Sequence, residues 1–202
     1  MWLHALRRGG VLTTAEWLEM RLALTGALRL ARGDPSGMAC FVASLDGFWR
    51  SFRAALICYP MFLILLDYRL TPEQEAVSEM WRIVTAETIG YAIAWAAYPL
   101  AALPLARWLG REERFLRFMV AYNWCQVPQT VLFLIVAAIA GGQPHLAALP
   151  QMAELIAAIT ALAYEWYVAR LTLALRNSRA VLFVLLDIVL GSMVSRVTES
   201  LY

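Results

Sequence analysis

The chain has 202 residues, of which 61% are hydrophobic and 16% are charged, and its formal net charge is only +2. A soluble domain is usually about 45–50% apolar and about 25% charged. The excess apolar residues lie in several runs of the roughly 20 residues needed to cross a bilayer, which predicts an all-α, polytopic membrane helix bundle. A nucleic-acid-binding function requires a basic stripe on a soluble domain, and the sequence contains none.

Residues that usually hold metals and cofactors are scarce. The two histidines, His4 and His145, lie near the N-terminus and in a predicted loop. The spans therefore lack a histidine pair for a membrane haem, and they also lack the usual zinc ligands. The three cysteines, Cys40, Cys58 and Cys125, stand singly and are interpreted as small buried hydrophobes. We expect no metal and no cofactor.

The first predicted helix covers residues 13–32 and opens with the capping-box pair Thr13 and Glu16. Apolar side chains repeat along one face of this helix: Trp17, Met20, Leu24, Leu28 and Ala31. A basic stripe runs beside them: Arg21, Arg29 and Arg32. Such an amphipathic helix can lie in the membrane interface or dock on the protein's own spans, and both alternatives stay open.

A break follows this helix. Gly33 is expected to end it, and Asp34 followed by Pro35 predicts the start of a short helix over about residues 35–44. We assign residues 1–45 to an N-terminal cytoplasmic or interfacial segment.

Five apolar segments then define a transmembrane domain of residues 46–202. The predicted spans are residues 48–66, 82–106, 116–140, 152–175 and 179–198. Ser44 and Asp46 are candidate caps for the first span. The fifth segment contains Asp187, so an alternative with four spans, in which this segment is too short to cross, also stays open.

Arginines alternate between the two ends of the predicted spans. They precede the first span and connect the second to the third and the fourth to the fifth: Arg50, Arg53, Arg107, Arg111, Arg114, Arg117, Arg176 and Arg179. By the positive-inside rule the N-terminus is cytoplasmic, and five spans place the C-terminus outside. The short loops and the arginine-only basic set favour a bacterial inner membrane.

Aromatic residues near the predicted span ends are interpreted as belts at the membrane–water interface. They are Trp49, Tyr68, Trp81, Tyr98, Trp108 and Tyr202.

Four ionisable residues fall well inside the predicted spans: Glu87, Glu165, Arg170 and Asp187. Each costs about 2.5–3.5 kcal/mol at a helix centre, so we expect them to face the bundle interior. Helical spacing places small or polar residues on one face of each of three spans. In the second span these are Ala86, Gly90, Ala94 and Ala97, and in the fourth they are Glu154, Ala158, Ala161 and Glu165. In the fifth span they are Asp187, Gly191, Ser195 and Thr198. Such stripes let helices approach closely.

The third span adds polar residues in the stretch AYNWCQVPQT, residues 121–130. Its amide side chains are Asn123, Gln126 and Gln129. We expect these amides to join the interior cluster and to donate to the carboxylates of the other spans. Two interpretations stay open. The cluster can be a structural network worth about 0.6–2 kcal/mol per hydrogen bond. It can also be a pathway or pocket for an ion, a proton or an amphipathic ligand.

No catalytic motif is present in the sequence. It contains no GxSxG, no HExxH and no Walker loop, and no serine has a neighbouring histidine that could activate it. We expect the protein not to be an enzyme.

Two motifs carry a family resemblance. SLDGFWRSF, from Ser44, resembles the entry motif of the Yip1-domain family without its proline, and AYNWCQVP resembles that family's tyrosine-then-proline signature in the third span. The resemblance implies five packed spans after a cytoplasmic segment and a non-enzymatic protein that recruits or organises membrane components. It implies structural roles for Gly47, Phe48, Trp49, Tyr122 and Pro128.

These observations lead to two functional hypotheses. The first is a non-enzymatic adaptor or accessory subunit that works in the lipid bilayer with a membrane-protein partner or as a homo-oligomer. The second is a small transporter or channel subunit that uses Glu87, Glu165 and Asp187.

Overall fold

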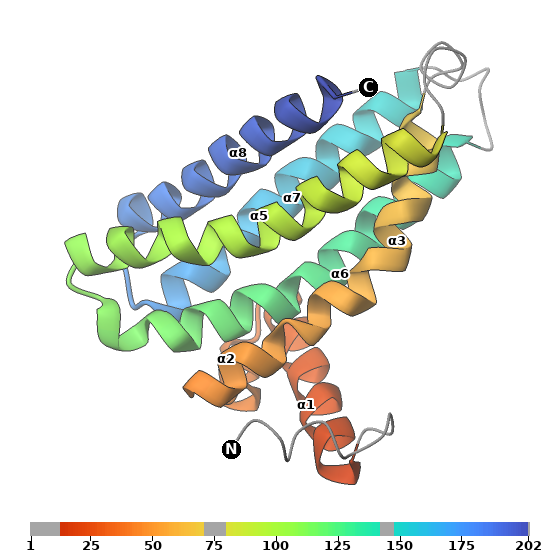
Figure 1. The fold of residues 1–202 in the computed structure, drawn as a ribbon. Coiled ribbons are helices and arrows are strands. Elements are labelled where there is room, and N and C mark those ends of the chain that lie inside the picture. Colours follow the sequence, from red (N-terminus) through yellow and green to blue (C-terminus); the bar gives the residue numbers. More distant parts are fainter. Residues whose placement is uncertain (1–12, 71–79, 142–147, 202) are drawn as a thin grey trace, which may run out of the picture.

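The computed structural model describes residues 13–70, 80–141 and 148–201, and all regular structure in these ranges is helical (Figure 1). The predicted all-α class is confirmed. The elements in chain order are α1 (Thr14–Ala31), η2 (Pro35–Cys40), α2 (Leu45–Ser51), α3 (Arg53–Arg69), α5 (Met80–Trp108), η3 (Glu112–Arg114), α6 (Phe115–Gly141), α7 (Ala148–Thr172) and α8 (Asn177–Glu199). His4, His145 and Tyr202 lie outside the described residues.

Five helical segments are long and apolar enough to cross a membrane: Leu45–Arg69, Met80–Trp108, Glu112–Ala140, Gln151–Thr172 and Asn177–Glu199. The last of these, α8, has 23 residues, so it extends about 34 Å, which exceeds the roughly 30 Å of a hydrocarbon core. The fifth apolar segment is therefore long enough to span. The fourth span ends three residues earlier than predicted, before Ala174, which has a positive φ of 49°.

The outward faces of these helices are covered by large apolar side chains. Leu56, in the first span, is 76% exposed, and exposed leucine, isoleucine, valine or methionine also recurs along each of the remaining four spans. A soluble protein rarely exposes such a continuous apolar surface. A surrounding bilayer accounts for it, and the fold defines an integral membrane helix bundle.

The spans are arranged in a ring, in which each helix packs against two neighbours. Backbone contacts join α3 to α6, α6 to α7, α7 to α8 and α8 to α5. Between α3 and α5 the ring is closed by side chains instead: the Tyr59 and Thr88 hydroxyls are 2.9 Å apart, and the Tyr91 hydroxyl donates to the Ala55 carbonyl at 2.7 Å. This arrangement leaves space between α3 and α5 on the inner side of the bundle.

The seam between α5 and α8 depends on the small residues that the sequence singled out. Gly90 is buried, and a side-chain carbon added to it would collide with the γ-methyl group of Thr198 in α8. Small-residue spacing in α5 therefore permits close backbone approach, as predicted.

The N-terminal helix α1 is docked on the bundle. The predicted capping box is present, since the Thr13 amide donates to the Glu16 carboxylate at 2.8 Å and the Glu16 amide donates to the Thr13 hydroxyl at 3.3 Å. The docked face coincides only in part with the predicted apolar face, because Met20 and Leu24 pack against the core whereas Leu28 is exposed. Ala23, Ala27 and Leu30 are buried, whereas Trp17 is 52% exposed. Small side chains allow α1 to approach α6 and α7 more closely than the bulkier face allows.

Ion pairs fix the position of α1. Arg50 in α2 binds Glu19 at 2.9 Å, and Arg53 in α3 binds Glu16. At the other end of the helix, the Tyr164 hydroxyl of α7 donates to the Ala27 carbonyl at 2.6 Å. Both acidic residues of α1 thus meet an arginine of the first span.

The break after α1 follows the predicted punctuation. Gly33 has a φ of 78°, and Asp34 caps η2 by accepting a hydrogen bond from the Ser36 amide at 2.9 Å. The short helix η2 ends at Cys40, four residues earlier than predicted. Ser44 then caps α2 by accepting from the Gly47 amide at 2.9 Å. The start of α2 and the α5–α6 and α7–α8 turns lie at the end of the bundle opposite the C-terminus (Figure 1).

Candidate functional site

Two of the three predicted interior acids come together between α7 and α8. Glu165 is only 4% exposed and Asp187 is half-buried, and the two carboxylates are close enough for their charges to interact. The Oε1 atom of Glu165 is buried and has no hydrogen-bond partner among the described residues. Two neighbouring carboxylates repel each other in a low-dielectric interior, so binding of a proton or another cation relieves the repulsion.

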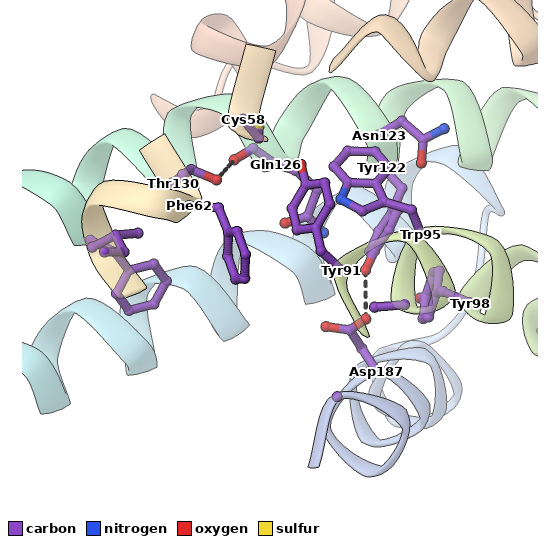
Figure 2. A pocket seen from close by; sticks show the side chains of 14 residues that line it. Cys58, Phe62, Tyr91, Trp95, Tyr98, Tyr122, Asn123, Gln126, Thr130 and Asp187 are labelled. Atoms are coloured by element: carbon purple, nitrogen blue, oxygen red, sulfur yellow. Dashed lines mark hydrogen bonds between the residues drawn. The ribbon is translucent and has the colours of Figure 1, made fainter. Parts of the chain in front are cut away.

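Two tyrosines complete this cluster. The Tyr122 hydroxyl of α6 donates to Asp187 Oδ1 at 2.5 Å (Figure 2). Tyr98 of α5 stacks on Tyr122 with ring centroids 4.1 Å apart and an interplanar angle of 16°, and it lies beside both carboxylates. The four helices α5 to α8 each contribute one residue. We call Tyr98, Tyr122, Glu165 and Asp187 the acid–tyrosine cluster.

A cavity of about 280 Å³ lies against this cluster, in the space between α3, α5, α6 and α8. Its wall includes six aromatic residues, namely Phe62, Tyr91, Trp95, Tyr98, Tyr122 and Phe133. Gln126 and Thr130 add polar groups to the wall (Figure 2). Asp187 is the one charged residue among the residues that line it. We call this space the central cavity.

A second cavity, of about 500 Å³, lies between α3, α6 and α7. Leu65 and Phe133 line both cavities, so these two side chains form the partition between them. The second cavity is lined by Arg69 and Glu154, which belong to the span ends opposite the arginine-rich turns. We call it the outer cavity.

The amides of the third span do not bind the carboxylates, contrary to the prediction. Asn123 is buried, and its Nδ2 donates to the Ser51 hydroxyl at 2.8 Å, which ties α6 to α2. Gln129 donates to the Cys125 carbonyl of its own helix at 3.3 Å. Asn123 and Gln126 both line the central cavity, and Gln129 does not. The donor to Asp187 is the tyrosine that precedes Asn123 in the sequence.

Arg170 and Glu87 lie outside the cluster. Arg170 is exposed, and its guanidinium lies 5.5 Å from the centroid of the Trp166 ring, so the prediction of an interior arginine was wrong. Its long side chain can reach the membrane interface from the end of α7. Glu87 is half-buried on α5 and does not line the central cavity. The acid pair consequently has no basic partner among the described residues.

Sequence reasoning missed Tyr98, which it assigned to the interfacial belt although the side chain is only 3% exposed. A signal was present. Tyr98 follows Glu87 by three helical turns and Ala94 by one turn, so the three residues share one face of α5. Proximity to a predicted span end outweighed this spacing, because most tyrosines at such positions are interfacial.

Comparison of the chain with protein-family models, curated proteins and solved structures finds no match. The resemblance to the Yip1-domain family stays a prediction. The fold and the site define the class of protein without it: an integral membrane bundle whose interior carries a pair of acids and two stacked tyrosines.

Proposed function

We propose that the protein is a small transporter or channel subunit that binds a proton or another cation at the Glu165–Asp187 pair. The observation that carries this proposal is an acid pair without a basic partner among the described residues, in which Glu165 is buried and Asp187 lines a cavity. Buried charges that serve only structure are usually paired. An acid kept inside a membrane protein at a cost of about 2.5–3.5 kcal/mol marks an ion or proton pathway in many proteins.

Flux measurements test this proposal. The purified chain is reconstituted in liposomes that contain a pH-sensitive dye, and proton movement is followed after a potassium-valinomycin potential is imposed. We expect Glu165→Gln and Asp187→Asn to reduce the flux to the rate of protein-free liposomes. Glu199→Gln, which changes an exposed acid at the end of α8, is the matched control. Equal flux in all four proteins contradicts a role for the pair in proton transport.

A second candidate function is the non-enzymatic adaptor or accessory subunit. The observation that favours it is the outward face of α1, where large apolar side chains are exposed together with Arg21 and Arg29. These apolar residues are Trp17, Leu18, Leu22 and Leu28. A membrane-protein partner, a second copy of this chain or the lipid interface can cover such a face. Native mass spectrometry of the protein extracted from its own membrane in mild detergent separates these outcomes, because a stoichiometric partner supports the adaptor function.

The arginine distribution supports a cytoplasmic N-terminus and an outside C-terminus in a bacterial inner membrane. In this orientation the outer cavity lies on the side of the outside face, and Leu65 and Phe133 separate it from the central cavity. Reporter fusions test the orientation: alkaline phosphatase is active only outside, and we expect activity when it is fused after residue 202. Activity of a cytoplasmic fluorescent reporter at the same position would reverse the assignment.

A further inference from the structure

The central cavity combines one carboxylate with an aromatic wall, and this combination identifies a class of ligand. Phe62 and Tyr91 have ring centroids 4.8 Å apart, and Tyr91 and Trp95 are 6.0 Å apart, so three rings follow one another along one part of the wall. The stacked pair Tyr98 and Tyr122 forms another part of it. The faces of aromatic rings carry negative potential and attract cations, with tryptophan the strongest.

Charge favours a cationic occupant. No arginine, lysine or histidine is among the residues that line the cavity, whereas Asp187 is among them. Tyr122 engages Oδ1 of Asp187, and the structure gives Oδ2 no hydrogen-bond partner among the described residues. An anionic ligand, or a neutral ligand without a hydrogen-bond donor, would displace water from that oxygen and give it no partner in return.

Size and ligand type favour an organic cation over a metal ion. Calcium takes six to eight oxygen ligands, and magnesium requires six in octahedral geometry. Among the described residues there is no group of three His, Cys, Asp or Glu side chains that could hold a metal ion. The cavity volume of about 280 Å³ equals that of about nine water molecules, which is far more than a bare ion occupies.

We propose that the central cavity binds an organic ammonium ion, with its charged nitrogen between Asp187 and the aromatic wall. Quaternary ammonium groups are recognised by aromatic cages of this composition. Gln126 and Thr130, on the α6 side of the cavity, are available to a hydroxyl or carbonyl group on the rest of the ligand. This inference rests on the proposed function, and it names the substrate class of the same site.

The test uses choline as the probe and its neutral isostere 3,3-dimethylbutan-1-ol as the comparison, because the two molecules differ in one atom and one charge. Binding to the purified full chain in nanodiscs is measured by isothermal titration calorimetry. We expect choline to bind at least about tenfold more tightly than the neutral isostere. We expect Asp187→Asn to remove that difference, and Glu199→Gln to leave it unchanged.

Graded substitution of the wall provides a second test that does not depend on the folding of the aspartate variant. In the series Trp95, Trp95→Phe and Trp95→Leu, the ratio of choline affinity to isostere affinity is expected to fall at each step, because the ring face weakens and is then lost. If Trp95 contributes only apolar surface, the two affinities fall together and the ratio stays constant. A constant ratio overturns the proposal.

The outcomes also separate this inference from the proposed function. Equal binding of choline and the isostere, or no binding of either, overturns the ammonium proposal. If proton flux in liposomes still requires Asp187, the proposed function stands without it. Choline binding that survives in Asp187→Asn overturns the assigned role of the carboxylate. Loss of both choline binding and flux dependence on the acid pair removes both proposals.

Discussion

Acidic residues in two regions of this protein have opposite surroundings. At the N-terminal helix, Glu16 and Glu19 bind Arg53 and Arg50. In the acid–tyrosine cluster, Glu165 and Asp187 face tyrosines and each other. A carboxylate with an arginine holds a helix in place, whereas a carboxylate without one is left to bind something else. If the proposed function holds, the partner, more than the acid itself, separates a structural position from a functional one.

The largest expected effect comes from removing Glu165, whose Oε1 atom is buried without a hydrogen-bond partner among the described residues. Glu165→Met replaces a buried carboxylate by an apolar side chain of similar length, so we expect transport to fall to background. We also expect the stability of the protein to rise by about 1–3 kcal/mol, because an unsatisfied buried polar atom disappears. At about 2–4 °C per kcal/mol for a chain of this size, thermal unfolding in detergent detects the gain.

Glu154→Met on the same helix is the control for this prediction. Glu154 is exposed, so its replacement is expected to leave the melting temperature nearly unchanged. A lower melting temperature for Glu165→Met would show that Glu165 has a structural role like that of Glu16, and the contrast between the two regions would then fail.

The cluster also depends on close contact between α5, which carries Tyr98, and α8, which carries Asp187. Gly90→Val places side-chain atoms against the Thr198 methyl group, and overpacking of this kind costs about 1–3 kcal/mol. We expect a lower melting temperature and weaker cation binding. Adding Thr198→Ser removes the colliding methyl group and is expected to restore part of both. Gly191→Ala is the control for the melting temperature, because an added carbon there has no neighbour within 4 Å.

Acid is expected to release α1. The hydrogen bond from the Thr13 amide and that from Arg53 lower the pKa of Glu16 from 4.5 to about 2. A carboxylate with a lowered pKa stabilises the docked state above its ordinary pKa, and this contribution is lost as the pH falls through the lowered value. The Thr13 amide belongs to the cap of α1 itself, whereas Arg53 joins the helix to the bundle. Both the cap and the docking of α1 should therefore weaken between about pH 4.5 and pH 2.

Hydrogen exchange of the α1 amides, corrected for the intrinsic rate and read out by pepsin digestion, measures this release. In Glu16→Gln the exchange should already be faster at neutral pH and depend less on acid. Identical acid dependence in the variant and the parent would assign the release to another group.

The smallest expected effect concerns the outward face of α1. A basic side chain near an anionic membrane surface contributes about 1 kcal/mol. We expect α1 to exchange hydrogen more slowly in nanodiscs that contain phosphatidylglycerol than in nanodiscs of phosphatidylcholine alone. Arg21→Gln should reduce the ratio of the exchange rates in the two kinds of nanodisc by a factor of at most about five. Insensitivity of α1 to lipid charge would favour a protein partner on this face.

Several features were readable from the sequence because they depend on sums or short spacings. The spans follow from the apolar content of about 20 consecutive residues, and all five fall within a few residues of their predicted bounds. The caps at Thr13, Asp34 and Ser44 follow from side chains that reach an amide two or three residues away. These interactions are local, so no knowledge of the packing is needed to predict them.

The composition of the site was only partly readable. The interior positions of Glu165 and Asp187 followed from the high cost of charge in lipid. Their partners did not follow, because Tyr122 and Asn123 are adjacent in the sequence and project about 100° apart on α6. One reaches Asp187 and the other reaches Ser51. A small rotation of the helix would exchange these roles without changing the hydropathy of the span.

The sequence by itself determined that the chain has five segments able to cross a membrane, the approximate bounds of its helices, and the interior positions of Glu165 and Asp187. Only the tertiary structure decided which faces meet: that α1 docks through Ala23, Ala27 and Leu30, that Arg170 is exposed, and that two tyrosines surround the acid pair. The physical reason is that lipid solvates an apolar side chain about as well as another helix does. Rotation of each helix is therefore set by close packing and by a few hydrogen bonds, which hydropathy does not report.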